Sequence, residues 1–113
     1  MTMNAAASQM WKERLTIPSY RIGEAATYAR VSPQTVAAWH KSRSAAKKPT
    51  LGEKAAGQGL SFLQLIEVAV VAEMRRAGVK LNEIRRARDY LAKTTGKPHP
   101  FAQLRFKTDG ADI

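Results

Sequence analysis

The spacing of apolar side chains predicts two short helices joined by a tight turn in the first third of the chain. Apolar residues recur at helical intervals over 22–29, IGEAATYA, so we expect the first helix there. Ser32 is a favourable N-cap for a second helix, and Pro33 at its first position needs no N–H. Val36 and Trp39, three residues apart, are expected to attach this helix to the core. The other positions would face outward: Gln34, Thr35, Ala37, Ala38 and His40.

A second helix held outward after a tight turn is the helix-turn-helix arrangement, in which that helix enters the DNA major groove. Small helical proteins that never bind DNA contain the same pattern, so the motif alone leaves both interpretations open. Charge favours DNA: 19 lysines and arginines against 9 aspartates and glutamates give a formal net charge of +10. Each phosphate that such a surface neutralises releases counterions and strengthens binding. A ribosomal protein, a merely soluble basic surface or a membrane-binding surface is the alternative.

The segment 41–59 is rich in lysine and glycine and has no sustained helical period. Its glycines and proline are turn signals, which predict a β-hairpin wing with strands near 46–51 and 59–61. Basic side chains of this wing would contact phosphates without reading sequence. A solvated basic loop is the alternative interpretation.

An unusually apolar helix is predicted over 62–78, FLQLIEVAVVAEMRRAG, with Ser61 as its N-cap and Gly78 at its C-terminal end. Its N-terminal half is apolar on nearly every side, and such a helix must be buried all round. A small domain has difficulty surrounding one helix with its own core, so we expect a partner subunit to cover part of it. The expected dimer or partner interface consists of Phe62, Leu65, Val68 and Ala72.

A further amphipathic helix is predicted over 80–93, and we expect much of its charge to be solvated and paired along its own surface. Beyond it, Leu104 and Phe106 alternate with polar residues and lead to Asp109-Gly110, a hairpin turn signal, which predicts a strand. The return strand would begin just where the chain stops. We therefore expect a longer protein, or a strand that another subunit completes.

These elements together predict a mainly α fold, namely a winged helix-turn-helix with a small β-hairpin wing and the start of a C-terminal strand or hairpin. We expect a flexible N-terminal arm over 1–17 and the DNA-binding domain over 18–96. A linker and the first strand or strands of a truncated second domain would occupy 97–113. A basic arm that reaches the minor groove is an alternative role for the N-terminal residues.

The residue types give catalysis no support. The chain has no cysteine, and His40 and His99 are far apart with no carboxylate at metal-ligand spacing, so we expect no metal and no cofactor. No phosphate-binding glycine loop is present, so we expect a protein that is not an enzyme. No secretion signal appears, and the apolar stretch 62–74 is shorter than the roughly 20 residues of a membrane span. We expect a cytoplasmic protein.

The residues expected to contact double-stranded DNA lie in the turn, along the second helix and in the basic segment after it. They are Arg30, Ser32, Pro33, Gln34, Thr35, Ala38, His40, Lys41, Arg43, Lys47 and Lys48. Gln34 and Thr35 would influence sequence preference, whereas Lys47 and Lys48 would strengthen binding to all DNA. His40, at the end of the second helix, is expected to contact phosphate or solvent.

The segment 20–39, which contains IGEA, VSPQTV and a final tryptophan, resembles the DNA-binding region of the MerR superfamily of winged helix-turn-helix regulators. The segment 80–91, KLNEIRRARDYL, extends this resemblance. It implies that the helix after the turn enters the major groove. Gln34 and Ala37 stand where MerR regulators usually carry arginines, so their contacts do not carry over directly. The long dimerising coiled coil and the effector-sensing domain of that superfamily are also absent.

A second likeness covers more of the chain, roughly residues 18–113. The segments 60–67, LSFLQLIE, and 106–110, FKTDG, are similar to the N-terminal DNA-binding region of VapB-type antitoxins of mycobacteria and their relatives. This resemblance implies a homodimeric transcriptional autoregulator from a type II toxin–antitoxin pair. A further C-terminal part would neutralise a PIN-domain ribonuclease toxin.

The alternative function is a helical protein-interaction module, either an adaptor or a toxin-neutralising unit, whose basic charge is incidental to DNA. Its binding would ignore DNA and depend on Leu65, Val68 and Ala72. An antitoxin combines both functions, because it binds DNA with one end and a toxin with the other.

Overall fold

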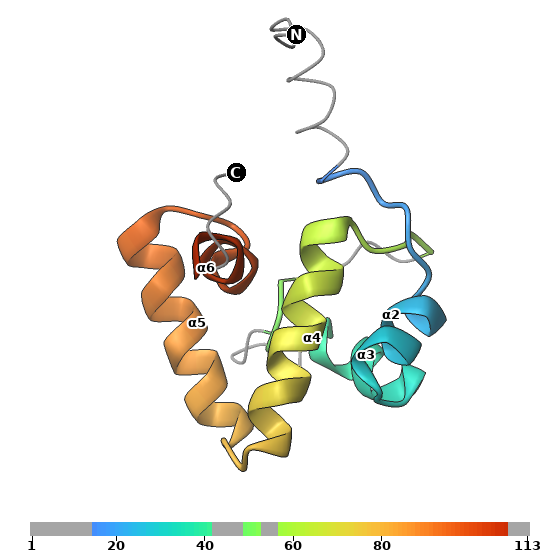
Figure 1. The fold of residues 1–113 in the computed structure, drawn as a ribbon, viewed down its shortest axis with the longest axis horizontal. Helices are drawn as coiled ribbons and strands as arrows, with labels where there is room; N and C mark the ends of the chain where they lie inside the picture. The colour runs from blue at the N-terminus through green and yellow to red at the C-terminus, as the bar shows by residue number, and fades with distance from the viewer. Residues whose placement is uncertain (1–14, 42–48, 53–56, 109–113) are drawn as a thin grey trace, which may run out of the picture.

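The computed structural model describes residues 15–41, 49–52 and 57–108, with side chains up to residue 105. In this part the chain is mainly helical, as predicted. The helices are α2 (Ile22–Ala29), α3 (Pro33–Trp39), α4 (Phe62–Arg76), α5 (Leu81–Thr95) and α6 (Pro100–Thr108). α4 lies in the centre, with α2 and α3 on one side and α5 and α6 on the other (Figure 1). None of these helices is long and apolar enough to cross a membrane.

Both ends of α4 follow the signals in the sequence. Ser61 and Gln64 form a reciprocal capping box: Ser61 Oγ accepts from the Gln64 N–H, and the Gln64 side chain accepts from the Ser61 N–H at 2.8 Å. At the other end, Gly78 has a φ of +93°, which is favourable for glycine alone. The N–H groups of Gly78 and Val79 donate to the carbonyls of Arg75 and Met74, so the helix ends in a Schellman motif.

The segment before α4 pairs with the segment before α2. Tyr20 and Leu60 form an antiparallel bridge, in which each N–H donates to the other's carbonyl. Gly59 permits this contact, because a Cβ at that position would overlap the carbonyl oxygen of Tyr20. The N–H of Leu51 donates to the Trp39 carbonyl at 2.8 Å. Among the described residues, the two predicted wing strands therefore do not pair with each other at Leu51 and Leu60; residues 46–48 of the first strand lie outside the described part.

The chain's own helices cover the apolar side chains of α4. Leu65, Val68 and Ala72 are buried in a core that also holds residues of α2, α3, α5 and α6, and Phe62 is half-buried against it. The prediction that these residues form a dimer or partner interface is therefore wrong for Leu65, Val68 and Ala72. Apolar residues all round α4 reflect its central position between two helical layers, and no second subunit is needed to bury them.

The prediction of a strand after residue 97 is also wrong over α6. Phe101 and Ala102 are neighbours in sequence and both are buried, which suits a helix packed in a corner between α4 and α5. Successive residues of a strand would point to opposite faces. Pro100 is favourable at the start of a helix, and the alternation at Leu104 was too short to indicate a strand against that signal.

A buried carboxylate joins α4 to α5 and α6. Glu67 is only 1% exposed, and its Oε1 accepts from Arg88 Nη2 at 2.8 Å. Its Oε2 accepts from the backbone N–H of Phe101 at 2.8 Å, and His99 Nδ1 lies 3.5 Å from Oε1. Arg88 also donates to the carbonyl of Pro98 at 3.0 Å. The prediction that the charge of α5 is mostly solvated and self-paired is therefore wrong for Arg88.

The Glu67 carboxyl stays ionised in this buried site. Burial raises its pKa, but the nearby His99 ring, the hydrogen bonds and charge of Arg88, and the amide of Phe101 outweigh burial. Together they hold the pKa of Glu67 below its ordinary value. The unfolded chain therefore binds a proton at this carboxyl at a higher pH than the folded chain does. Its contribution to stability is complete above the ordinary glutamate pKa and is lost as the pH falls through the folded-state pKa.

We expect Glu67→Gln to lower the free energy of unfolding at neutral pH by about 3 kcal/mol, because Arg88 loses its buried counter-charge. The free energy of unfolding should also fall less steeply on acidification than in the unchanged protein. Urea unfolding between about pH 3 and pH 7 measures both effects.

Glu73→Gln is the matched control, since the Glu73 carboxylate is largely exposed and pairs with Arg105 at 3.2 Å. We expect it to change stability by less than about 1 kcal/mol. If the free energy of unfolding falls equally steeply on acidification in the unchanged protein and in Glu67→Gln, the lowered pKa of Glu67 is contradicted.

Candidate nucleic-acid interface

A sharp reversal between α2 and α3 sets the direction of α3. Arg30 adopts the left-handed conformation (φ 60°, ψ 45°), and the N–H of Val31 donates to the Ala26 carbonyl at 3.0 Å. Glycine adopts this conformation readily, whereas a residue with a Cβ loses roughly 1 kcal/mol. On α4, Arg76 Nη1 donates to the carbonyl oxygen of Ala29 at 2.9 Å. This long-range bond holds the turn in place against α4.

The side chain of Ser32 caps the first turn of α3, as predicted. Its Oγ accepts from the N–H of Thr35 at 3.1 Å and lies 2.8 Å from the Thr35 hydroxyl. Pro33 occupies the first helical position and, like Ser32, is exposed. Because the two hydroxyls expected to contact DNA are hydrogen-bonded to each other, the exposed Gln34 is the clearer candidate for a base contact.

The helix α3 has a buried side and an exposed side, as its spacing predicts. Val36 is fully buried and Trp39 is 5% exposed, and both belong to the same core cluster as the small side chains of α2. Gln34 and Ala38 are exposed, and Ala37 is partly exposed. An exposed row of this kind is what a helix presents to base edges in the major groove.

The prediction that His40 contacts phosphate or solvent is wrong. Its side chain is 5% exposed, and its Nδ1 lies 2.9 Å from the carbonyl oxygen of Val36. Because a carbonyl oxygen only accepts, Nδ1 carries the proton of this bond. Residues four apart lie on the same side of a helix, so the buried position of Val36 also turns His40 inward.

Basic side chains surround the α2–α3 pair, while α3 itself carries no charged residue. Arg21, Arg30 and Lys41 are exposed near the helix ends. Glu24 lies in the first turn of α2, where its carboxylate accepts from the Arg21 N–H at 2.9 Å. The remaining predicted phosphate contacts lie outside the described residues: Arg43, Lys47 and Lys48.

The structure has a pocket beside the turn, lined by residues of α2, α4 and α6 and rich in arginine. The sequence-based predictions did not include it. Arg105 on α6 donates to Glu73 on α4 at 3.2 Å, and the two residues are 32 positions apart. No local periodicity relates such distant residues, and the strand predicted for α6 would not have brought them together. Among the described residues, no three metal-ligating side chains gather.

Comparison with known proteins finds a likeness to a mycobacterial protein. No protein-family model matches the chain, and no solved structure matches it significantly. The chain is similar to a protein of Mycobacterium tuberculosis (strain ATCC 25618 / H37Rv) named "Putative antitoxin VapB45", with 30% identity over 122 residues. The match covers 96% of this chain and 50% of that protein, so the chain spans about half the length of the relative that it matches.

Proposed function

We propose that this chain binds double-stranded DNA through α3, as the DNA-binding part of a bacterial transcriptional autoregulator. The observation that carries the proposal is the capped helix α3, whose Val36 and Trp39 are buried while Gln34 and Ala38 face outward. The exposed Arg30 and Lys41 lie just before and just after it, and the chain as a whole has a formal net charge of +10. Phosphate contacts by such side chains would set the register, and the exposed row of α3 would read bases.

A β-hairpin wing of the MerR type is part of this proposal. The N–H of Leu51 donates to the Trp39 carbonyl, and Leu60 pairs with Tyr20. Both ends of the intervening segment are thus anchored on the α2–α3 pair. The basic residues expected in this wing, Arg43, Lys47 and Lys48, would contact phosphates that flank the groove.

We further propose that the chain belongs to an antitoxin of a type II toxin–antitoxin pair whose toxin is a PIN-domain ribonuclease. The similarity to the mycobacterial protein named as an antitoxin supports the antitoxin role. A homodimer would match a two-fold symmetric operator. Because Leu65, Val68 and Ala72 are buried in the chain's own core, the proposed dimer surface lies elsewhere.

The DNA proposal predicts different effects for Gln34→Ala and Lys41→Ala. Gln34→Ala should lower affinity for the DNA upstream of the gene about tenfold and leave binding to a scrambled duplex nearly unchanged, because only the base contact is lost. Lys41→Ala should weaken binding to both duplexes equally and flatten the salt dependence by about one unit. Fluorescence anisotropy at low and near-physiological salt measures both.

Lys93→Ala is the matched control for this experiment. It removes the same charge from the exposed surface of α5, which lies across α4 from α3 (Figure 1). If Gln34→Ala and Lys41→Ala change DNA affinity and its salt dependence no more than Lys93→Ala does, α3 is not the recognition helix. The helical interaction module then becomes the better explanation of the fold.

The burial of His40 generates a separate prediction. His40→Ala should lower the free energy of unfolding by about 1–3 kcal/mol, because it removes a buried hydrogen bond and leaves a cavity. The salt dependence of DNA binding should stay as it is in the unchanged protein, since no phosphate contact is lost. Urea unfolding and anisotropy titrations against salt test the two parts. Unchanged stability with a flatter salt dependence would restore His40 as a phosphate contact.

A further inference from the structure

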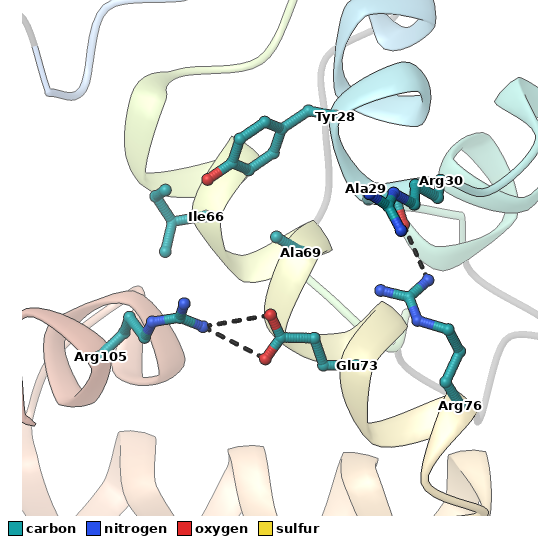
Figure 2. A pocket seen from close by; sticks show the side chains of 8 residues that line it. All are labelled: Tyr28, Ala29, Arg30, Ile66, Ala69, Glu73, Arg76 and Arg105. Atoms are coloured by element: carbon teal, nitrogen blue, oxygen red, sulfur yellow. Dashed lines mark hydrogen bonds and ion pairs between the residues drawn. The ribbon is translucent and has the colours of Figure 1, made fainter.

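A pocket of about 410 Å³ lies beside the turn, bordered by α2, α4 and α6 (Figure 2). Its volume falls within the range of sites that bind small molecules or single side chains of a partner. Ile66 and Ala69 on α4 supply apolar lining, and the Tyr28 ring projects over them from α2 (Figure 2). One part of the wall is therefore apolar and aromatic.

The charged part of the wall has an excess of arginine. Arg30 from the turn, Arg76 from α4 and Arg105 from α6 line the pocket together with Glu73, which gives the lining a formal charge of +2. The side chains of Arg105 and Glu73 are each about half exposed, and Nη1 of Arg105 lies 3.2 Å from Oε2 of Glu73. Exposed pairs of this kind contribute little stability, so an incoming carboxylate can engage Arg105 at small cost. Guanidinium groups bind carboxylates with two parallel hydrogen bonds.

Two features favour a protein segment over a free small acid. Tyr28 is 58% exposed at the edge of the pocket, and Leu104, next to Arg105 on α6, is 51% exposed. They are two of the four large hydrophobic side chains exposed among the described residues. A peptide that carries apolar residues beside its acidic ones would cover this surface, whereas a small acid would leave it in water.

The pocket also suits DNA less well than it suits a peptide. A phosphodiester strand carries a negative charge at every nucleotide, whereas a peptide can place an uncharged apolar residue beside the Glu73 carboxylate. Acidic side chains of a peptide match the arginines of the lining, and its apolar side chains match Ile66 and Ala69.

We propose that this pocket binds an acidic, partly apolar segment of a protein partner, with one carboxylate on Arg105, a second on Arg76 and an apolar side chain against Ile66. The site goes beyond the proposed DNA binding and does not depend on it. It lies next to the turn before α3, because Arg76 donates to the carbonyl of Ala29. A carboxylate on Arg76 competes with that carbonyl, so a partner in the pocket acts directly on the contact that holds the turn.

The test uses a short fluorescein-labelled peptide of alternating glutamate and leucine, and a counterpart with glutamine in place of glutamate. Anisotropy is measured with the whole chain and without DNA. We expect the glutamate peptide to bind and Arg105→Gln to lower its affinity about tenfold, the effect of losing one charge-assisted hydrogen bond. Arg86→Gln, which removes the same charge from the exposed surface of α5, should change the affinity less than twofold.

Several results would overturn the proposal. Equal losses in Arg105→Gln and Arg86→Gln would mean that the peptide is attracted by the basic surface in general. Equal binding of the glutamine peptide would mean that the pocket does not select a carboxylate. If Arg105→Gln lowers affinity for a DNA duplex as much as for the peptide, Arg105 is a phosphate contact. Thermal unfolding of Arg105→Gln checks that the chain remains folded.

Because the peptide titration contains no DNA, it fails or succeeds independently of the proposed DNA binding. Weaker duplex binding in Lys41→Ala with peptide binding intact would support both proposals. Duplex binding with no peptide binding in the unchanged chain would remove the pocket proposal alone.

Discussion

The buried carboxylate of Glu67 determines how the C-terminal half of this protein is assembled. A carboxylate that is 1% exposed costs several kcal/mol unless it is paired and hydrogen-bonded. Its partners come from two other elements: the Arg88 guanidinium from α5 and the backbone N–H of Phe101 from α6. Neither helix can move away from α4 without removing a hydrogen-bond partner from this buried carboxylate. Apolar contacts alone would tolerate small shifts between the three helices, whereas these short hydrogen bonds permit one register.

The other side of α4 is packed by a different means. Ala25, Ala26 and Ala29 on α2 are fully or almost fully buried, and their small side chains let α2 approach α4 closely. Val36 and Trp39 then attach α3 to the same core. At the turn, α4 holds the end of α2 by a hydrogen bond from Arg76 to the Ala29 carbonyl. As a result, α4 is covered on both sides within one chain, and its apolar sequence needs no second subunit.

The proposed DNA surface and the proposed acidic-peptide pocket meet at the turn between α2 and α3. Arg30 takes part in both, since it is exposed beside α3 and lines the pocket. Its left-handed backbone conformation is unfavourable for a residue other than glycine, so the turn depends on the packing around it. A partner in the pocket would therefore act on the least favourable part of the backbone near α3. This arrangement offers a physical link between protein binding and DNA binding that requires no large movement.

The sequence by itself determined the helices α2, α3 and α4 and the caps at Ser32 and Ser61, because these depend on residues within one or two turns of each other. It also determined which side of α3 is buried, since Val36 and Trp39 share one side of a helix. Only the tertiary structure decided the positions of Glu67, His40 and α6. The partners of Glu67 lie 21 and 34 residues away, and no local pattern relates groups at such separations. The short alternation around Leu104 suggested a strand, but burial of Phe101 and Ala102 against α4 and α5 favours a helix, since a strand would turn one of them toward water.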